Sequence, residues 1–200
     1  MPIQNGQESH DKRIDRKDFV LSHSVLIDEK TIETRVGELA NLIATDLPTR
    51  QPILLGLLTG SFVFLADLVR HLSHHGIEPK VEFLKVSHYG DTSDPSQSVR
   101  FLREQLPRLT DEVVVVVDDI FDSGFSLHAV NEHLRQQKPA WVRFCTLLDK
   151  PSRHQVALRV DYVGFEIPDV WIIGYGLDLG GEGRALPYLG AVEGANQEAR

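Results

Sequence analysis

Five consecutive valines, residues 113–117, constrain the fold of this chain more than any other feature of its sequence. Valine favours strands, and an apolar run without polar alternation indicates a strand that is buried on both faces. Asp118 and Asp119 follow the valines directly, and the segment 122–126 (Asp-Ser-Gly-Phe-Ser) leads into a helical pattern. The sequence therefore predicts a central buried strand, two carboxylates at its end, and a glycine-containing turn before a helix.

Apolar runs that indicate strands alternate with segments of helical spacing along most of the chain. Strands are predicted at 52–58, 81–86, 112–117, 141–148, 162–165 and 170–173, and helices at 28–43, 62–72 and 126–135, with Asp28 as the first N-cap. This order is typical of an α/β fold in which helices cover both faces of a parallel sheet. Ligands of such folds bind at the carboxyl ends of the strands, where we expect Thr59-Gly60, Asp118-Asp119, Lys150 and Asp178 to meet.

Composition and charge fit one globular domain that binds neither nucleic acid nor membrane. The chain has 200 residues, 42% of them hydrophobic, and a formal net charge of -8, which disfavours an extended surface for nucleic acid or anionic lipid. It has no apolar run long enough to cross a membrane, no signal-peptide pattern, and a single cysteine, Cys145, which rules out an intrachain disulfide. We expect a cytoplasmic protein with a polar arm at 1–18, one domain at 19–192 and a tail at 193–200.

The segment 122–126 has the features of an anion-binding turn. Gly124 permits a tight turn, Ser123 and Ser126 supply hydroxyls, and the first amides of the following helix have no partner within that helix. The segment is not a Walker loop, because the ending Gly-Lys-Ser/Thr is absent. No cation lies near Asp118 and Asp119 in the sequence, so their expected partners are a metal ion or sugar hydroxyls. The alternative is that these residues only end a strand and cap a helix.

Residues 116–124 (Val-Val-Asp-Asp-Ile-Phe-Asp-Ser-Gly) resemble the phosphoribosyl pyrophosphate signature of type I phosphoribosyltransferases. Further segments, in the same order along the chain, resemble the hypoxanthine-guanine branch of that family: 57–68, 87–90, 147–153 and 163–188. The resemblance covers residues 20–192. It implies a parallel sheet flanked by helices, with a small hood that is formed by terminal segments and includes residues 165–192.

The resemblance implies the transfer of the 5-phosphoribosyl group from phosphoribosyl pyrophosphate to N9 of a 6-oxopurine. Hypoxanthine and guanine are the expected bases, and the products are IMP or GMP and pyrophosphate. Relatives use Mg²⁺ and form homodimers or homotetramers, so we expect the same here. Magnesium prefers oxygen ligands and keeps several waters, which suits the carboxylates Asp118, Asp119 and Asp178.

The resemblance also implies roles for particular residues. Asp122 matches the carboxylate beside N7 of the purine, which acts as general acid/base. The phosphoribosyl group is expected at Asp118, Asp119, Asp122, Ser123, Gly124, Phe125 and Ser126, and pyrophosphate at Thr59, Gly60 and Arg184. The purine is expected at Lys150, Trp171, Ile172 and Asp178.

Within the purine site, Lys150 would donate a hydrogen bond to the 6-oxo group, which favours oxopurines over adenine. Trp171 would stack on the base, and Ile172 would contact it through its backbone. The segment 89–98 is expected to form a lid that excludes water, with Ser87, His88 and Tyr89 at its start.

Several residues depart from the pattern of the family. Thr59 stands where most relatives carry lysine or arginine, next to a peptide bond, Leu58-Thr59, that is cis in relatives. Asp118 replaces a glutamate, His88 separates a Ser-Tyr pair, and Gly180, Gly181 and Gly183 predict a loose segment before Arg184.

Three alternatives to a hypoxanthine-guanine enzyme follow from the sequence. One is an enzyme that prefers xanthine or another base. Another is an inactive homologue in which Thr59 disables the pyrophosphate loop. The third is a regulator of the same fold that binds RNA or a nucleotide without catalysis, although the net charge of -8 disfavours RNA.

Overall fold

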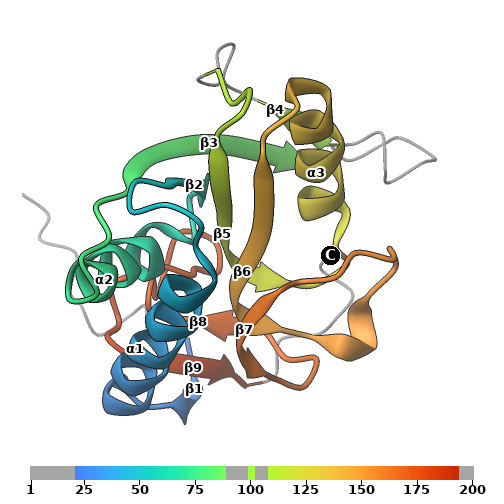
Figure 1. Ribbon diagram of the computed structural model, residues 1–200. Helices are drawn as coiled ribbons and strands as arrows, with labels where there is room; N and C mark the ends of the chain where they lie inside the picture. The colour runs from blue at the N-terminus through green and yellow to red at the C-terminus, as the bar shows by residue number, and fades with distance from the viewer. Residues whose placement is uncertain (1–20, 89–98, 102–107, 194–200) are drawn as a thin grey trace, which may run out of the picture.

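A computed structural model describes residues 21–88, 99–101 and 108–193 of the chain, and Figure 1 shows their arrangement. The central feature is a six-stranded sheet with the strand order β4-β3-β2-β5-β6-β7. Its strands are β2 (Ile53–Leu58), β3 (Lys80–His88), β4 (Val99–Phe101), β5 (Val113–Phe121), β6 (Trp141–Asp149) and β7 (Tyr162–Glu166). All neighbours from β3 to β7 are parallel, and only β4 is antiparallel at the edge. The predicted α/β fold with a parallel sheet is confirmed.

The valine run occupies the middle of this sheet and supplies both cores of the protein. Val115 and Val117 belong to one cluster of buried residues, together with helices α1 (Glu29–Asp46) and α2 (Phe62–Ser73). Val114 and Val116 belong to a second cluster with helix α3 (Phe125–Gln137) on the other face. Because successive side chains of a strand point to opposite faces, a strand between two helical layers must be apolar at every position.

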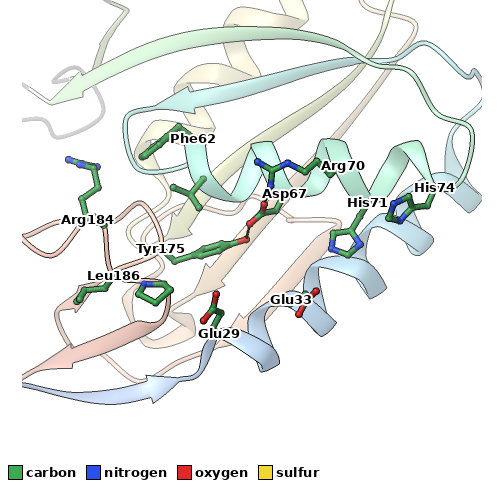
Figure 2. Close-up of a pocket in the computed structure, with 13 residues that line it drawn as sticks. Glu29, Glu33, Phe62, Asp67, Arg70, His71, His74, Tyr175, Arg184 and Leu186 are labelled. Carbon is green, nitrogen blue, oxygen red and sulfur yellow. Dashed lines mark hydrogen bonds and ion pairs between the residues drawn. The ribbon is translucent and has the colours of Figure 1, made fainter.

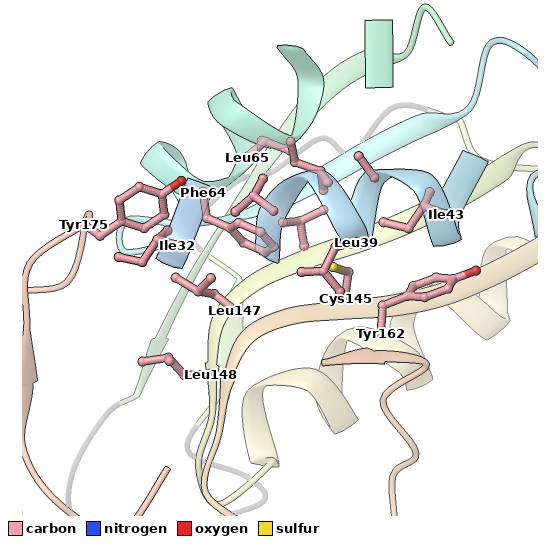
Figure 3. Packing of buried hydrophobic residues seen from close by; sticks show 14 of the residues in the cluster. Ile32, Leu39, Ile43, Phe64, Leu65, Cys145, Leu147, Leu148, Tyr162 and Tyr175 are labelled. Atoms are coloured by element: carbon pink, nitrogen blue, oxygen red, sulfur yellow. The ribbon is translucent and has the colours of Figure 1, made fainter. Parts of the chain in front are cut away.

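The helix α1 begins and packs as its sequence predicts. The Asp28 carboxylate accepts a hydrogen bond from the backbone N–H of Thr31 at 2.8 Å, which makes Asp28 the N-cap. The buried face of α1 packs against α2 and the sheet (Figure 3), and includes Ile32, Val36, Leu39, Ala40 and Ile43. Arg35 also links α1 to β7, since it donates to the carbonyl oxygens of Gly164 and Val163 at 2.8 and 2.9 Å.

A separate three-stranded antiparallel sheet forms the hood. Its strand order is β1-β9-β8, with β1 at His23–Ile27, β8 at Ile172–Ile173 and β9 at Leu189–Val192. The N-terminal strand therefore pairs with the C-terminal strand, and His23 lies opposite Val192. The sequence did not predict β1 or β9, because β1 is largely exposed and β9 is a short segment that contains a glycine.

Three boundaries differ from the prediction. The strand β5 continues to Phe121, so that Asp118 and Asp119 lie within the strand rather than beyond its end. Pairing with β6 sustains it, since Asp118 lies opposite Thr146 and Phe121 opposite Asp149. The strand β3 extends to His88, whereas β8 has only two residues. The predicted N-terminal arm, the lid residues 89–98 and all of the predicted tail except Glu193 lie outside the described residues.

No helix among the described residues has both the length and the apolar character that a membrane span requires.

We predict that Leu39→Ala lowers the free energy of unfolding by about 2–5 kcal/mol, because the Leu39 side chain is fully buried between α1 and the sheet. The matched control is Leu42→Ala on the same helix, where the side chain is 48% exposed and the cost should stay below about 0.5 kcal/mol. Urea denaturation of the parent and both variants measures these changes in the free energy of unfolding. Equal losses would contradict the assignment of the buried face of α1.

Candidate active site

Two adjoining cavities of about 540 and 370 Å³ lie at the carboxyl edge of the central sheet. The larger is bordered by the β5–α3 connection, and the smaller is bordered by the hood. Asp122 lines both of them. The walls that the two cavities share come from the ends of β2, β3 and β5 and the residues after them: Leu58, Thr59, Gly60, Val86, Asp119, Ile120 and Asp122.

The turn 122–126 forms one wall of the larger cavity. Gly124 has a φ of 88°, and a Cβ atom there would lie 2.4 Å from Val156 and 2.7 Å from the Phe121 ring, so only glycine fits. No side chain caps the N-terminus of α3, which leaves its first amides for an anion. Ser123, Gly124 and Ser126 line the cavity, whereas Phe125, which was also predicted to contact the ligand, lines neither cavity.

A segment after β6 supports this turn from outside. The backbone N–H groups of Lys150 and Gln155 donate to the carbonyl oxygens of Phe121 and Ser123 at 2.9 and 3.0 Å. The His154 ring packs on the Phe121 ring, with their centroids 4.2 Å apart. The turn is therefore held by backbone hydrogen bonds as well as by the helix that follows it.

Four charged side chains form an ion network between the two cavities. Lys150 is only 2% exposed, and its Nζ lies 3.7 Å from a carboxylate oxygen of Asp122 and 3.6 Å from one of Asp169. Arg153 donates to Asp122 at 3.0 Å and lies 3.8 Å from Asp169. The hydrogen bond with Asp122 raises the pKa of Arg153. Two cations thus share two carboxylates, which is the arrangement that a buried charge requires.

Arg153 and Asp169 were not predicted as site residues. Arg153 follows Lys150 by three residues in a short 3₁₀ turn, Pro151–Arg153, which brings both cations to the same side of the chain. This spacing was visible in the sequence. Nothing near Asp169 in the sequence indicated a partner in Lys150 or Arg153.

The carboxylates Asp118 and Asp119 lie at the floor of the larger cavity. Their side chains accept hydrogen bonds from the next backbone N–H groups, those of Asp119 and Ile120, at 3.0 and 3.1 Å. Burial raises the pKa of Asp118 well above its ordinary value, and the neighbouring charge of Asp119 raises it further. Burial also raises the pKa of Asp119. Among the described residues, no lysine, arginine or histidine forms an ion pair with either carboxylate.

Asp118 and Asp119, which form no ion pair with a described side chain, are suited to bind a divalent cation through their carboxylate oxygens. The described residues contain no group of three or more His, Cys, Asp or Glu side chains that is arranged to hold a metal. Asp178, the third predicted ligand, lines only the smaller cavity. A cation bound by the pair would therefore complete its coordination with water and ligand oxygens, as magnesium commonly does.

The loop after β2 is held tightly between β5 and the hood. A Cβ atom on Gly60 would lie 1.6 Å from the Asp119 carboxylate, and one on Gly176 would lie 2.3 Å from the Gly60 carbonyl oxygen. The Ser61 hydroxyl donates to the Leu57 carbonyl at 2.5 Å, and the Leu58-Thr59 peptide bond is cis. Thr59 and Gly60 line both cavities.

The hood supplies the remaining wall of the smaller cavity through Trp171, Ile172, Asp178 and Arg184. Arg184 forms an ion pair with Asp178 and donates to the Gly176 carbonyl. The three glycines before Arg184 have φ values of 63°, 92° and 82°, which form turns, and the N–H of Gly181 donates to Asp178 at 2.7 Å. These glycines allow the chain to fold back onto Asp178.

Most predicted site residues thus meet around the two cavities. Ser87 and His88 lie at the end of β3, but their side chains and the whole of Tyr89 lie outside the described residues. One cation that was not predicted, Lys85, also lines the smaller cavity.

A third cavity of about 730 Å³ lies between α1, α2 and the hood (Figure 2). Tyr175 is in its wall and donates to the Asp67 carboxylate at 2.5 Å. Burial and this hydrogen bond raise the pKa of Tyr175. Arg184 lines both this third cavity and the cavity of about 370 Å³ at the edge of the central sheet.

Comparison with known proteins identifies relatives along most of the chain. Residues 24–179 match the family described as the phosphoribosyl transferase domain. The hypoxanthine phosphoribosyltransferase of Haemophilus influenzae is 38% identical over 171 residues, which cover 84% of this chain and 94% of the relative. The hypoxanthine-guanine phosphoribosyltransferase of Bacillus subtilis is 34% identical over 175 residues, which cover 88% and 96%.

Solved structures agree with these relatives. The structure of a hypoxanthine-guanine phosphoribosyltransferase from Bacillus anthracis has a TM-score of 0.77 and 40% identity, over 84% of this chain and 98% of the other. That of the hypoxanthine phosphoribosyl transferase of Trypanosoma cruzi has a TM-score of 0.82 and 32% identity, over 88% and 94%.

We predict that Gly60→Ala destabilises the fold by about 1–3 kcal/mol, because the added methyl group would overlap the Asp119 carboxylate. The matched control is Gly37→Ala on α1. There the methyl group would lie 3.4 Å from the His71 ring, so the higher helix propensity of alanine should leave stability unchanged or raise it by up to about 1 kcal/mol. Thermal unfolding of the two variants tests this, and a Gly60 variant as stable as the parent would contradict the close approach.

We predict that Asp118→Asn raises the melting temperature at pH 7.5 in the presence of EDTA. Because burial raises the pKa of Asp118, the folded state holds this proton more tightly than the unfolded chain, and stability falls as the carboxyl ionises with rising pH. Asparagine does not ionise, so the variant avoids this loss of stability. At this chain length, each kcal/mol of unfolding free energy shifts the melting temperature by about 2–4 °C.

The difference in melting temperature between Asp118→Asn and the parent should narrow as the pH is lowered toward about 4, where Asp118 in the folded parent is protonated and, like asparagine, carries no charge. The exposed Asp111→Asn serves as the control and should change little at either pH. A lower melting temperature for Asp118→Asn at pH 7.5 would mean that the ionised carboxylate is stabilising.

Proposed function

The chain belongs to the phosphoribosyl transferase family, and from that premise we propose that it is a purine-salvage enzyme. It transfers the 5-phosphoribosyl group of phosphoribosyl pyrophosphate to N9 of a 6-oxopurine, hypoxanthine and also guanine, and yields IMP or GMP and pyrophosphate. One observation carries the proposal: Asp122 lines both cavities, between an anion-binding turn and the buried Lys150. A carboxylate in that position can face the base and the sugar phosphate at once.

The larger cavity suits the sugar phosphate. The 5-phosphate would lie against the turn 122–126, where amides at the start of α3 and the hydroxyls of Ser123 and Ser126 can donate to it. The ribose hydroxyls would face Asp118 and Asp119. Thr59 and Gly60, which line both cavities beside Asp119, would contact the pyrophosphate.

The smaller cavity suits the purine. Lys150 would donate to the 6-oxo group, Trp171 would stack on the ring and Ile172 would contact the base through its backbone. Adenine presents hydrogens at position 6, which face the Lys150 ammonium unfavourably. The side chains do not favour hypoxanthine or guanine over each other, so a preference for xanthine is the main alternative within this class.

Departure of pyrophosphate builds positive charge on the ribose and negative charge on the leaving group. The negative charge of Asp118 and Asp119 would stabilise the ribosyl cation, and Arg184 would bind the leaving group. Asp122 would accept the proton of N7 as N9 attacks the anomeric carbon, because bond formation at N9 makes the purine more acidic. Lys150 and Arg153 hold this carboxylate in place through the ion network.

Magnesium is the cofactor that we propose for Asp118 and Asp119, with Asp178 near a second ion. When bound, it would neutralise charge on the pyrophosphate and on the ribose hydroxyls. The raised pKa of Asp118 supports this assignment, since a buried carboxylate without a protein cation gains most from a bound cation.

A catalytically silent regulator that binds RNA is the alternative from another class. The net charge of -8 disfavours the phosphate contacts that dominate RNA binding. We also propose that the protein forms a homodimer or homotetramer and is located in the cytoplasm. Both proposals repeat what the sequence led us to expect.

We predict that Asp122→Asn lowers kcat for hypoxanthine by about 10²–10⁴-fold, because asparagine cannot accept the N7 proton. The spectrophotometric assay contains phosphoribosyl pyrophosphate, magnesium and hypoxanthine, guanine, xanthine or adenine in turn. The matched control is Asp161→Asn, which alters an aspartate that is ion-paired with Arg143 near β6, away from both cavities. It should retain the activity of the parent.

Two outcomes would contradict this function. If the folded parent turns over none of the four bases, its function as a salvage enzyme is excluded. Salt-dependent binding of RNA, seen as a mobility shift of the RNA, would then support the function as a regulator. If the parent is active and Asp122→Asn retains its kcat, the general-base role is excluded.

A further inference from the structure

The cations that line the two active-site cavities differ in whether a carboxylate already pairs with them. The described cations that line the two active-site cavities are Lys85, Lys150, Arg153 and Arg184. Lys150 and Arg153 share Asp122 and Asp169, and Arg184 is paired with Asp178. Thr59, which lines both cavities, brings no charge. Only Lys85 has no carboxylate partner among the described residues.

The position of Lys85 follows from the sheet. In the parallel pair β2–β3, Lys85 lies directly opposite Leu58, the residue before Thr59. Its side chain is exposed and lines the smaller cavity together with Thr59, Gly60 and Asp178. The neighbours Leu84 and Leu57 are buried in the core, so β3 is fixed at this point. Lys85 therefore places a positive charge beside the loop after β2, in which Thr59 is uncharged.

The surrounding charge makes such a lysine useful. Asp119, Asp122 and Asp178 also line the smaller cavity, and the chain has a net charge of -8. An anionic substrate that approaches this edge is repelled unless nearby cations offset the carboxylates. Lysine is a compact point charge on a flexible stem, and it binds phosphate groups without the fixed geometry that arginine requires.

We propose that Lys85 is a pyrophosphate-binding residue, and that it supplies from strand β3 the positive charge that Thr59 does not supply from the loop after β2. This inference rests on the proposed function and adds a residue to it. It also explains how the loop can bind pyrophosphate with threonine at position 59.

The test is the kinetics of Lys85→Gln. We expect the KM for phosphoribosyl pyrophosphate, and that for pyrophosphate in the reverse reaction, to rise about tenfold, as for one charge-assisted contact worth about 1.4 kcal/mol. The kcat and the KM for hypoxanthine should change less than about twofold, because a contact made equally in the ground and transition states acts on KM alone. The dependence of kcat/KM on salt should weaken.

The matched control is Lys80→Gln, which removes an exposed lysine from the other end of the same strand. Lys80 lies 4.0 Å from Glu112, and it lines neither active-site cavity. This control should keep both KM values of the parent. A complementing variant, Thr59→Lys combined with Lys85→Gln, should recover most of the lost affinity, because it moves the charge from the strand to the adjacent loop.

The outcomes separate this inference from the proposed function. An active parent with an unchanged KM for phosphoribosyl pyrophosphate in Lys85→Gln would overturn the role of Lys85 alone. So would an equal loss in Lys80→Gln. If the parent turns over no base, calorimetric titration of parent and Lys85→Gln with phosphoribosyl pyrophosphate and magnesium still decides the point: weaker binding by the variant supports it, and equal binding overturns it.

Discussion

The burial of the Lys150 ammonium is the constraint on which the arrangement of this site depends. A lysine that is 2% exposed must be paired, and its partners Asp122 and Asp169 come from the β5–α3 connection and from the hood. Arg153 joins the same two carboxylates from the 3₁₀ turn after Lys150. These ion pairs therefore link the turn 122–126 to the end of β6 and to the hood, at the boundary between the two cavities.

The charged residues of the site fall into two groups, the ion network around Lys150 and the carboxylate pair Asp118 and Asp119. In the ion network each cation has carboxylate partners, whereas Asp118 is buried and Asp119 half-buried with no ion pair to a described side chain, and only the more distant charge of Arg184 lowers the pKa of Asp119. The raised pKa of Asp118 reflects a free-energy cost that the folded protein bears in the absence of ligands. Occupancy of this side by a cation and a substrate would reduce the cost, so that ligand binding and stability are coupled.

The sequence predicts the elements whose apolar pattern is local and misses those that depend on distant partners. The valine run, the N-cap Asp28 and the turn 122–126 were read correctly because neighbouring residues determine them. Strand β5 runs past the valines because pairing with β6 sustains it, and the sequence of β5 does not reveal that pairing. Asp169 was missed for the same reason, since it meets Lys150 and Arg153 only after the hood has folded onto the sheet.

The hood also sets an order of assembly. Its first strand, β1 (His23–Ile27), pairs with β9 (Leu189–Val192), and the whole central sheet is synthesised between them. At a translation rate of about 5–20 residues per second, β1 waits on the order of ten seconds or more for its partner. The central sheet and its anion-binding turn can form during that interval. A nascent chain can therefore complete the hood, with the wall that carries Trp171 and Arg184, only after β9 has been made.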